Sequence, residues 1–164
     1  MNKWTLHVRE FGKIEKADVE VAPMTIFLGD NNSGKSYLMT LIYGLLNLHI
    51  YFQKYVFQED SQEYKECALI VETMVDHWNT DCRLQKDEIQ RFEQLFNRIM
   101  EENMSFFLKN LFNKDMEIGQ LQVEFSTENE YIFEVLYDSE LQIYCKANKK
   151  ELMSGFSWGE NIGC

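Results

Sequence analysis

The sequence predicts an α/β fold that begins with short strands, continues through a helical middle and closes with an antiparallel β-meander. Three observations predict it. A glycine-rich loop at residues 29–36 lies between two apolar runs. Hydrophobic residues then recur at helical spacing through residues 63–111, and they alternate with polar residues from position 121 to position 145. At 164 residues and 45% hydrophobic content, the chain suits one domain with a buried core.

The first 28 residues predict three short strands, over residues 3–9, 17–21 and 24–28. In the first, apolar and polar residues alternate, as they do on a half-buried strand. The third is a continuous apolar run, which is typical of a buried strand. Pro23 is the only proline of the chain, and it precedes this third run, where a missing N–H group is tolerated.

The loop reads Gly-Asp-Asn-Asn-Ser-Gly-Lys-Ser from residue 29 to residue 36, a complete G-x-x-x-x-G-K-[ST] pattern. Its two glycines let the backbone curl and let phosphate oxygens approach the amides. Successive N–H groups form an anion nest, to which the following helix adds its positive end. Lys35 is placed to neutralise β- and γ-phosphates, and the Ser36 hydroxyl to bind Mg²⁺. Strand, loop and helix together predict a nucleotide-phosphate site.

Helices are predicted over residues 35–57, 63–79 and 89–100, the last continuing towards Leu111. The first carries no charge from residue 36 to residue 53, which is near the length of a membrane span. Because polar residues interrupt it and it starts inside a phosphate loop, a helix buried within the protein is the better interpretation, and no membrane contact is expected.

After residue 120 apolar and polar residues alternate, so the hydrophobic pattern has a period of two. This pattern predicts strands over residues 121–125, 131–137 and 141–145, in an antiparallel meander with one buried face. The Gly/Ser-rich tail is expected to be loose. We therefore expect a single lobe with four segments: strands, loop and first helix (1–58), a helical insertion (59–116), antiparallel strands (117–150) and the tail (151–164).

Charge is distributed unevenly. Residues 1–50 hold five basic and five acidic side chains, and the rest hold 11 and 22, so the net charge of −11 lies entirely outside the loop-bearing part. An acidic surface repels nucleic-acid phosphates, so direct DNA or RNA binding is not expected.

The four cysteines form no C-x-x-C pair and the N-terminus lacks the apolar region of a signal peptide, which predicts reduced thiols and a cytoplasmic protein.

Residues 11–36 resemble the opening of ABC-type ATPases of the chromosome-maintenance and overcoming-lysogenization-defect kind, which are labelled AAA family ATPases. The shared features are an aromatic-Gly turn, an acidic strand, a Pro-x-Thr strand and the Asn-Asn-Ser within the loop. The resemblance implies the N-terminal lobe of a P-loop NTPase that uses ATP and Mg²⁺. It implies nucleotide contacts from Gly29, Asn31, Asn32, Ser33, Gly34, Lys35, Ser36 and Tyr37, with Mg²⁺ on Ser36.

Two elements with which this family hydrolyses ATP are not recognisable. One is the Walker B run of four apolar residues ending in Asp-Glu, which holds Mg²⁺ and activates water. Residues 135–138 come nearest, but Ser139 stands in place of the Glu, and we interpret them as a hairpin edge. The other is the Ser-Gly signature, echoed only at residues 154–155.

The chain thus resembles a lobe truncated before Walker B. ATP binding is expected to survive, whereas hydrolysis requires a C-terminal lobe or a partner, either a second ATPase lobe or a homodimer. Analogy with the family also implies a nuclease partner.

Two other functions stay open. One is an independent small P-loop GTPase or kinase, because Asn-Lys-Lys-Glu at residues 148–151 resembles the guanine-reading Asn-Lys-x-Asp motif except at its last position. Competition of bound ATP by GTP separates this function from the first. The other is a non-catalytic interaction module that works through its helical middle, and nucleotide-independent dimerisation favours it.

Overall fold

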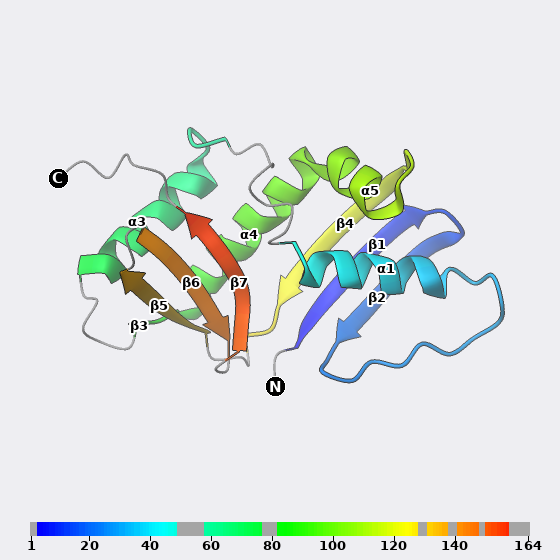
Figure 1. Cartoon of the computed structure of the whole chain (residues 1–164), viewed down its shortest axis with the longest axis horizontal. Helices are drawn as coiled ribbons and strands as arrows, with labels where there is room; N and C mark the ends of the chain where they lie inside the picture. The colour runs from blue at the N-terminus through cyan, green and yellow to red at the C-terminus, as the bar shows by residue number, and fades with distance from the viewer. Residues whose placement is uncertain are drawn as a thin grey trace.

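The computed structural model describes residues 3–48, 58–76, 82–127, 131–137, 141–147 and 150–157. In these residues the strands form two antiparallel sheets with helices between and beside them (Figure 1). The first sheet has the order β2-β1-β4, with β1 at Trp4–Phe11, β2 at Ile14–Val21 and β4 at Ile118–Phe125. The second has the order β3-β5-β6-β7, with β3 at Cys82–Arg83, β5 at Tyr131–Tyr137, β6 at Leu141–Ala147 and β7 at Lys150–Ser157. The helices are α1 at Lys35–Leu46, α3 at Gln62–Asp76, α4 at Lys86–Glu102 and α5 at Met104–Phe112.

The first sheet is built around β1, which pairs with β2 on one side and β4 on the other. The hairpin between β1 and β2 is tight, because Phe11 pairs with Ile14 across a two-residue turn. Gly12 in that turn has φ +61, a conformation that favours glycine. Leu6 and Val8 of β1 are fully buried, so the predicted alternation is confirmed and one face of the sheet is the core face.

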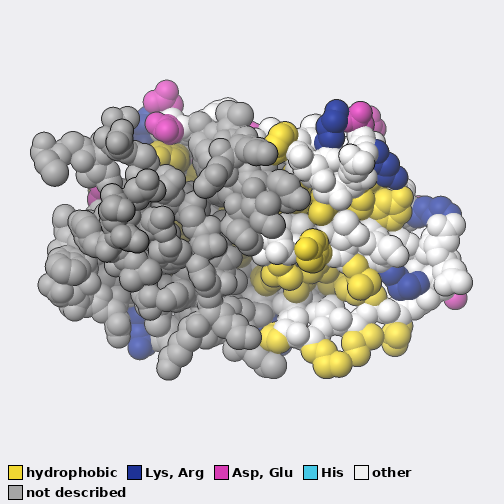
Figure 2. Space-filling model, viewed as in Figure 1, with side chains coloured by type: hydrophobic (Ala, Val, Ile, Leu, Met, Phe, Trp, Pro, Cys, Tyr) yellow, Lys and Arg dark blue, Asp and Glu magenta, His cyan; other side chains and the backbone are white. Residues whose placement is uncertain are grey.

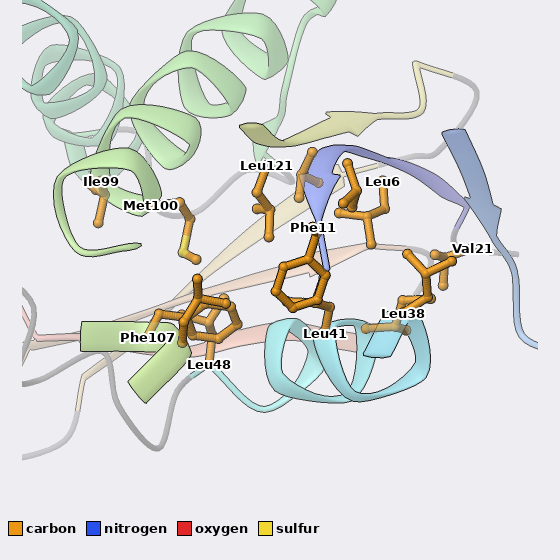
Figure 3. Close-up of a cluster of buried hydrophobic side chains, with 14 of the residues drawn as sticks. Leu6, Phe11, Val21, Leu38, Leu41, Leu48, Ile99, Met100, Phe107 and Leu121 are labelled. Carbon is orange, nitrogen blue, oxygen red and sulfur yellow. The ribbon is translucent and has the colours of Figure 1, made fainter. Parts of the chain in front are cut away.

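Helix α1 lies across this core face, and α4 and α5 pack beside it (Figures 1 and 3). Figure 3 shows Leu38 and Leu41 of α1 close to Phe11 at the end of β1. Phe107 of α5 closes the cluster beside α1. The N-terminal strands, the loop-following helix and part of the helical middle therefore share one core.

The helical stretch after residue 86 is two helices rather than one. Asn103 is buried, and its side-chain amide donates to the Ile99 carbonyl at 2.9 Å, which competes with continued helix formation. The Phe107 amide then donates to the Asn103 carbonyl at 2.9 Å, which starts α5. Because the apolar spacing continues across this break, periodicity alone could not locate it.

The free edge of β4 is satisfied by side chains of α4. The Asn97 amide donates to the Val123 carbonyl at 2.8 Å, and its oxygen accepts from the Val123 N–H at 2.7 Å. Glu93 accepts from the Phe125 N–H at 2.6 Å. Burial is the main influence on the Glu93 carboxyl and raises its pKa, while the bond to Phe125 opposes this. Two polar side chains thus take the place of a neighbouring strand.

Asn97→Ala is expected to lower the free energy of unfolding by about 2 kcal/mol, because it leaves a half-buried N–H and C=O of β4 without partners. Urea denaturation followed by circular dichroism measures the change. Asn110→Ala is the matched control, since within the described part of the chain that exposed side chain bonds to the Phe106 carbonyl of its own helix. Equal losses in the two variants would contradict the assigned role of Asn97.

On the opposite face of the first sheet, His7 of β1 bridges the two outer strands. Its Nδ1 lies 2.8 Å from an Asp18 oxygen and its Nε2 lies 3.2 Å from a Glu124 oxygen. Arg9 adds an ion pair to Asp18 at 2.7 Å. Hydrogen bonds from His7 first, and then from Arg9, hold the pKa of Asp18 well below its usual range. The polar face therefore also helps to fix the register of the three strands.

Several predicted elements are wrong. Residues 24–28 are not a strand, and the apolar side chains of Met24, Ile26 and Leu28 are exposed, because no described strand lies beside them. The stretch 121–125 belongs to β4 in the first sheet rather than to the meander. The predicted loose tail contains β7, which pairs with β6 and completes a meander of β5, β6 and β7.

The remaining predicted boundaries shift by smaller amounts. Within the described residues α1 ends at Leu46, and positions 49–57 of the predicted first helix lie outside them. Helix α3 ends at Asp76, ahead of predicted positions 77–79, which also lie outside the described residues.

No helix in the described part of the chain is long and apolar enough to cross a membrane. Cys67 is a free, buried thiol whose pKa burial raises to about 12, so it is unreactive near neutral pH.

Candidate phosphate-binding site

The glycine-rich loop links the segment after β2 to the start of α1, at one end of the first sheet (Figure 1). Three of its residues have positive φ: Gly29 at +143°, Asn32 at +69° and Gly34 at +89°. Left-handed residues of this kind occur in anion nests, in which backbone N–H groups converge on one point. Glycine or asparagine occupies each of these positions, the residue types that tolerate them.

Lys35 is folded over this loop. Its Nζ donates to the Gly29 carbonyl at 2.7 Å, to the Asp30 carbonyl and to the Ser33 hydroxyl at 3.0 Å. These bonds hold the ammonium group against the loop backbone. Loop residues 29–33 are exposed, so an anion from solvent can reach this charge.

The first turn of α1 is open to an anion. Gly34 is its N-cap and provides no side-chain hydrogen bond, and no acidic residue lies in the first turn. The first helical bond runs from the Leu38 N–H to the Gly34 carbonyl at 3.1 Å, so the amides of residues 35–37 have no acceptor within the helix. These amides and the helix dipole favour a negatively charged ligand.

Ser36 is exposed in this first turn, and its carbonyl accepts from Thr40 Oγ1 at 2.8 Å. Within the described ranges no group of three His, Cys, Asp or Glu side chains is arranged to hold a metal ion. A Mg²⁺ ion accompanying a nucleotide would therefore take the Ser36 hydroxyl, phosphate oxygens and water, which suits an ion that keeps several waters.

Tyr37 anchors the loop to the core. Its ring lies edge-on to Phe11 with centroids 5.6 Å apart, and it lies 5.6 Å from Phe112 at the end of α5. Phe11 and Phe112 are also 5.6 Å apart, so three aromatic rings from β1, α1 and α5 meet at one point. This cluster fixes the start of α1, and with it the loop, relative to the first sheet.

Two residues that the sequence did not single out lie beside this site. Ile14 of β2 would meet a Cβ atom built on Gly34, at 2.6 Å from its Cγ1. Lys114 follows α5, and its Nζ lies 3.4 Å from the Tyr37 hydroxyl and 5.5 Å from its ring centre. Lys114 is 77 positions from Tyr37, and no local pattern marks it, so only the tertiary structure brings this second lysine near the loop.

The structure also shows where the nearest matches to the Walker B run and to the Ser-Gly signature lie. Residues 131–137 form β5 in a hairpin with β6, which agrees with the hairpin interpretation, and Asp138 lies outside the described residues. Ser154 and Gly155 lie within β7. A groove of about 990 Å³ between α4 and β4 is lined by five glutamates, together with Arg98 and His7, and this acidic excess disfavours phosphate.

Comparison with known proteins agrees with this geometry. Residues 4–157 match a family model described as AAA ATPase domain, which covers the first sheet, the loop and all described helices. Neither the curated proteins nor the solved structures contain a match to this chain.

Proposed function

This chain belongs to the AAA ATPase domain family, and from that premise we propose that it binds ATP through residues 29–37 as the N-terminal half of an ABC-type ATPase. In this proposal the anion nest and the open end of α1 bind the phosphates, and Lys35 neutralises the β- and γ-phosphates. The Tyr37 amide contacts the α-phosphate. Mg²⁺, held partly by the Ser36 hydroxyl, supplies further neutralisation of the phosphate charge.

The observation that carries the proposal is the position of Lys35. Its ammonium group is held by the Gly29 carbonyl and the Ser33 hydroxyl, one residue from the uncapped start of α1 at Gly34. An ammonium and uncapped amides that converge from two sides suit an anion with several oxygens. The chain as a whole is strongly acidic, with a net charge of −11, so anion binding depends on these local groups and not on the overall charge.

Hydrolysis is expected to need residues from elsewhere. Phosphoryl transfer depends on a carboxylate that supports Mg²⁺ and on a second group that orients water. The described residues bring no acidic cluster to Ser36, and the 164-residue sequence has no apolar run ending in Asp-Glu. A second ATPase lobe or a second copy of the chain would supply them.

The test is a titration of the purified chain with a fluorescent ATP analogue in the presence of Mg²⁺, followed by phosphate-release measurements at saturation. We expect saturable binding, with phosphate release at a rate close to that of ATP alone in buffer. Unlabelled ATP should displace the analogue more effectively than GTP. Absence of binding would refute the proposal, and steady turnover that Lys35→Ala removes would refute the requirement for a second lobe.

Ser36→Ala tests the metal ligand separately. The hydroxyl is needed only for Mg²⁺, so we expect this variant to bind the analogue in EDTA as tightly as the wild type does. Added Mg²⁺ should then strengthen binding in the wild type and have little effect in the variant. Ser105→Ala, in α5, is the control for removing a hydroxyl elsewhere. An equal response of wild type and Ser36→Ala to Mg²⁺ would show that Ser36 is not a ligand.

A further inference from the structure

The turn after α5 brings a lysine to the first turn of α1. Helix α5 ends at Phe112, and its C-cap Asn113 has φ +52°, a left-handed conformation that asparagine tolerates and that turns the chain away from the helix axis. Lys114 follows at once. Its Nζ donates to the Tyr37 hydroxyl at 3.4 Å and lies 5.5 Å from the centre of the Tyr37 ring. Both contacts hold the ammonium group at the tip of one tyrosine side chain.

The ammonium group of Lys114 is accessible to a ligand. Lys114 is exposed, and the neighbouring carboxylate of Asp115 pairs with Lys109 instead, at 3.1 Å. Within the described ranges no carboxylate forms an ion pair with Lys114, whose hydrogen bond goes to a neutral hydroxyl. The positive charge is therefore uncompensated, and further N–H donors of the ammonium group remain for an anion.

Tyr37 connects this lysine with the amides at the start of α1. Its N–H belongs to residues 35–37, whose amides have no acceptor within the helix. Its ring is packed against Phe11 and Phe112, with centroids 5.6 Å from each. Lys114 is therefore one tyrosine side chain away from an uncapped amide, and the aromatic cluster fixes that separation.

We propose that Lys114 binds the α-phosphate of the nucleotide, as a second cation of the site beside Lys35, and that the Tyr37 hydroxyl positions it. This inference rests on the proposed function, which assigns the β- and γ-phosphates to Lys35 and the α-phosphate to the Tyr37 amide. In that arrangement the charge of the α-phosphate is not neutralised by Lys35. Lys114 is held against the same tyrosine whose amide contacts this phosphate. Its ammonium, on a flexible four-carbon stem, can turn from the hydroxyl to a phosphate oxygen.

The surface around the loop suits an anion with several charges. Figure 2 shows Lys and Arg side chains spread over the end of the molecule at which Figure 1 places the loop and the end of α5. The whole chain has a net charge of −11, so cations at this end act against an acidic background. Cations near a binding site raise the local concentration of a polyanion and favour its approach.

The proposed position gives Lys114 a role that differs from that of Lys35. A ligand that fills the β- and γ-positions alone contacts Lys35 and leaves Lys114 on its tyrosine. A ligand with three phosphates contacts both lysines. Lys114 therefore favours a triphosphate chain over pyrophosphate, and it does so whether or not a nucleoside is attached.

Competition against the fluorescent ATP analogue tests this role, with ATP, inorganic tripolyphosphate and pyrophosphate as unlabelled ligands at constant ionic strength. Lys114→Ala should weaken ATP and tripolyphosphate about tenfold, the order expected for one charge-assisted hydrogen bond at an exposed site. It should leave pyrophosphate nearly unchanged. Lys35→Ala should weaken all three ligands, and Lys86→Ala, the same charge change at the start of α4, should weaken none.

Tyr37→Phe tests the positioning. The change keeps the ring in its aromatic cluster and removes the hydroxyl that holds Lys114. We expect ATP and tripolyphosphate to bind about threefold more weakly, as for the loss of one ordinary hydrogen bond, with pyrophosphate and the urea midpoint of unfolding unchanged. In a Lys114→Ala background the same change should have no further effect, because the hydroxyl acts through the lysine.

Three results would overturn the inference. The first is equal ATP binding by Lys114→Ala and Lys86→Ala; if Lys35→Ala still loses binding, the proposed function stands and Lys114 has no part in it. The second is a loss for ATP without a loss for tripolyphosphate, which would place Lys114 at the nucleoside. The third is an equal loss for all three ligands, which would show a general effect of charge. Where pyrophosphate binds too weakly to displace the analogue, ATP and tripolyphosphate decide, with Lys86→Ala as the measure of general charge. Failure of the wild type to bind either ligand would refute the proposed function as well.

Discussion

Lys35→Ala is expected to weaken ATP binding by about a hundredfold or more. The wild-type ammonium is held against the loop by the Gly29 carbonyl and the Ser33 hydroxyl, and in the proposed site it contacts the β- and γ-phosphates. Each charge-assisted hydrogen bond contributes roughly 1.5–3 kcal/mol, and about 1.4 kcal/mol corresponds to a tenfold change in affinity. Titration with the fluorescent ATP analogue measures the loss.

The control for this substitution is Lys86→Ala, which removes an exposed lysine at the start of α4. It should bind ATP as the wild type does. Urea denaturation should give both variants a free energy of unfolding within about 0.5 kcal/mol of the wild type, as for surface substitutions in general. If Lys35→Ala binds ATP normally while folded, the loop is not the phosphate site.

Gly34→Ala is expected to destabilise the protein and abolish nucleotide binding. Gly34 has φ +89°, a conformation that costs an L-residue about 1–2 kcal/mol. Its added Cβ would also lie 2.6 Å from Ile14 Cγ1 and 2.9 Å from Ile14 Cδ1, a clash that adds about 1–3 kcal/mol. Because Gly34 caps α1, any shift there turns the first-turn amides away from the phosphates. Urea denaturation and ATP titration measure the two effects.

Gly12→Ala separates backbone strain from steric clash. Gly12 has φ +61°, but no atom lies within 4 Å of its added Cβ, so we expect a loss of only about 1 kcal/mol. Combining Gly34→Ala with Ile14→Ala removes the clashing atoms and should recover part of the lost stability. A double-mutant cycle with no coupling between the two positions would show that Ile14 does not restrict Gly34.

The sequence predicted best those elements whose conformation depends on residues that are neighbours in the chain. The loop pattern of residues 29–36 depends on neighbouring residues, and the structure shows the expected start of α1 at Lys35 and the positive φ angles of Gly29 and Gly34. The alternation in residues 3–9 likewise predicted β1, because burial of Leu6 and Val8 follows from a single strand facing the core.

The errors arose where structure depends on distant partners. Periodicity recognised residues 121–125 as a strand but could not show that it pairs with β1, about 115 positions earlier in the chain. Residues 24–28 have the composition of a buried strand, yet composition cannot supply the neighbour that a ladder requires. Lys114 and Ile14 lie beside the loop only because α5 and β2 are packed there, and no local pattern predicts such contacts.

The hydrogen bonds from Asn97 and Glu93 to β4 also influence how molecules of this protein meet at high concentration. An open strand edge recruits other chains into a growing sheet, which is a common first step in fibril formation. In this molecule the main-chain groups of Val123 and Phe125 are already engaged by α4. Addition of a strand at β4 would first require α4 to detach, so the helix gives this edge a kinetic barrier against fibril growth.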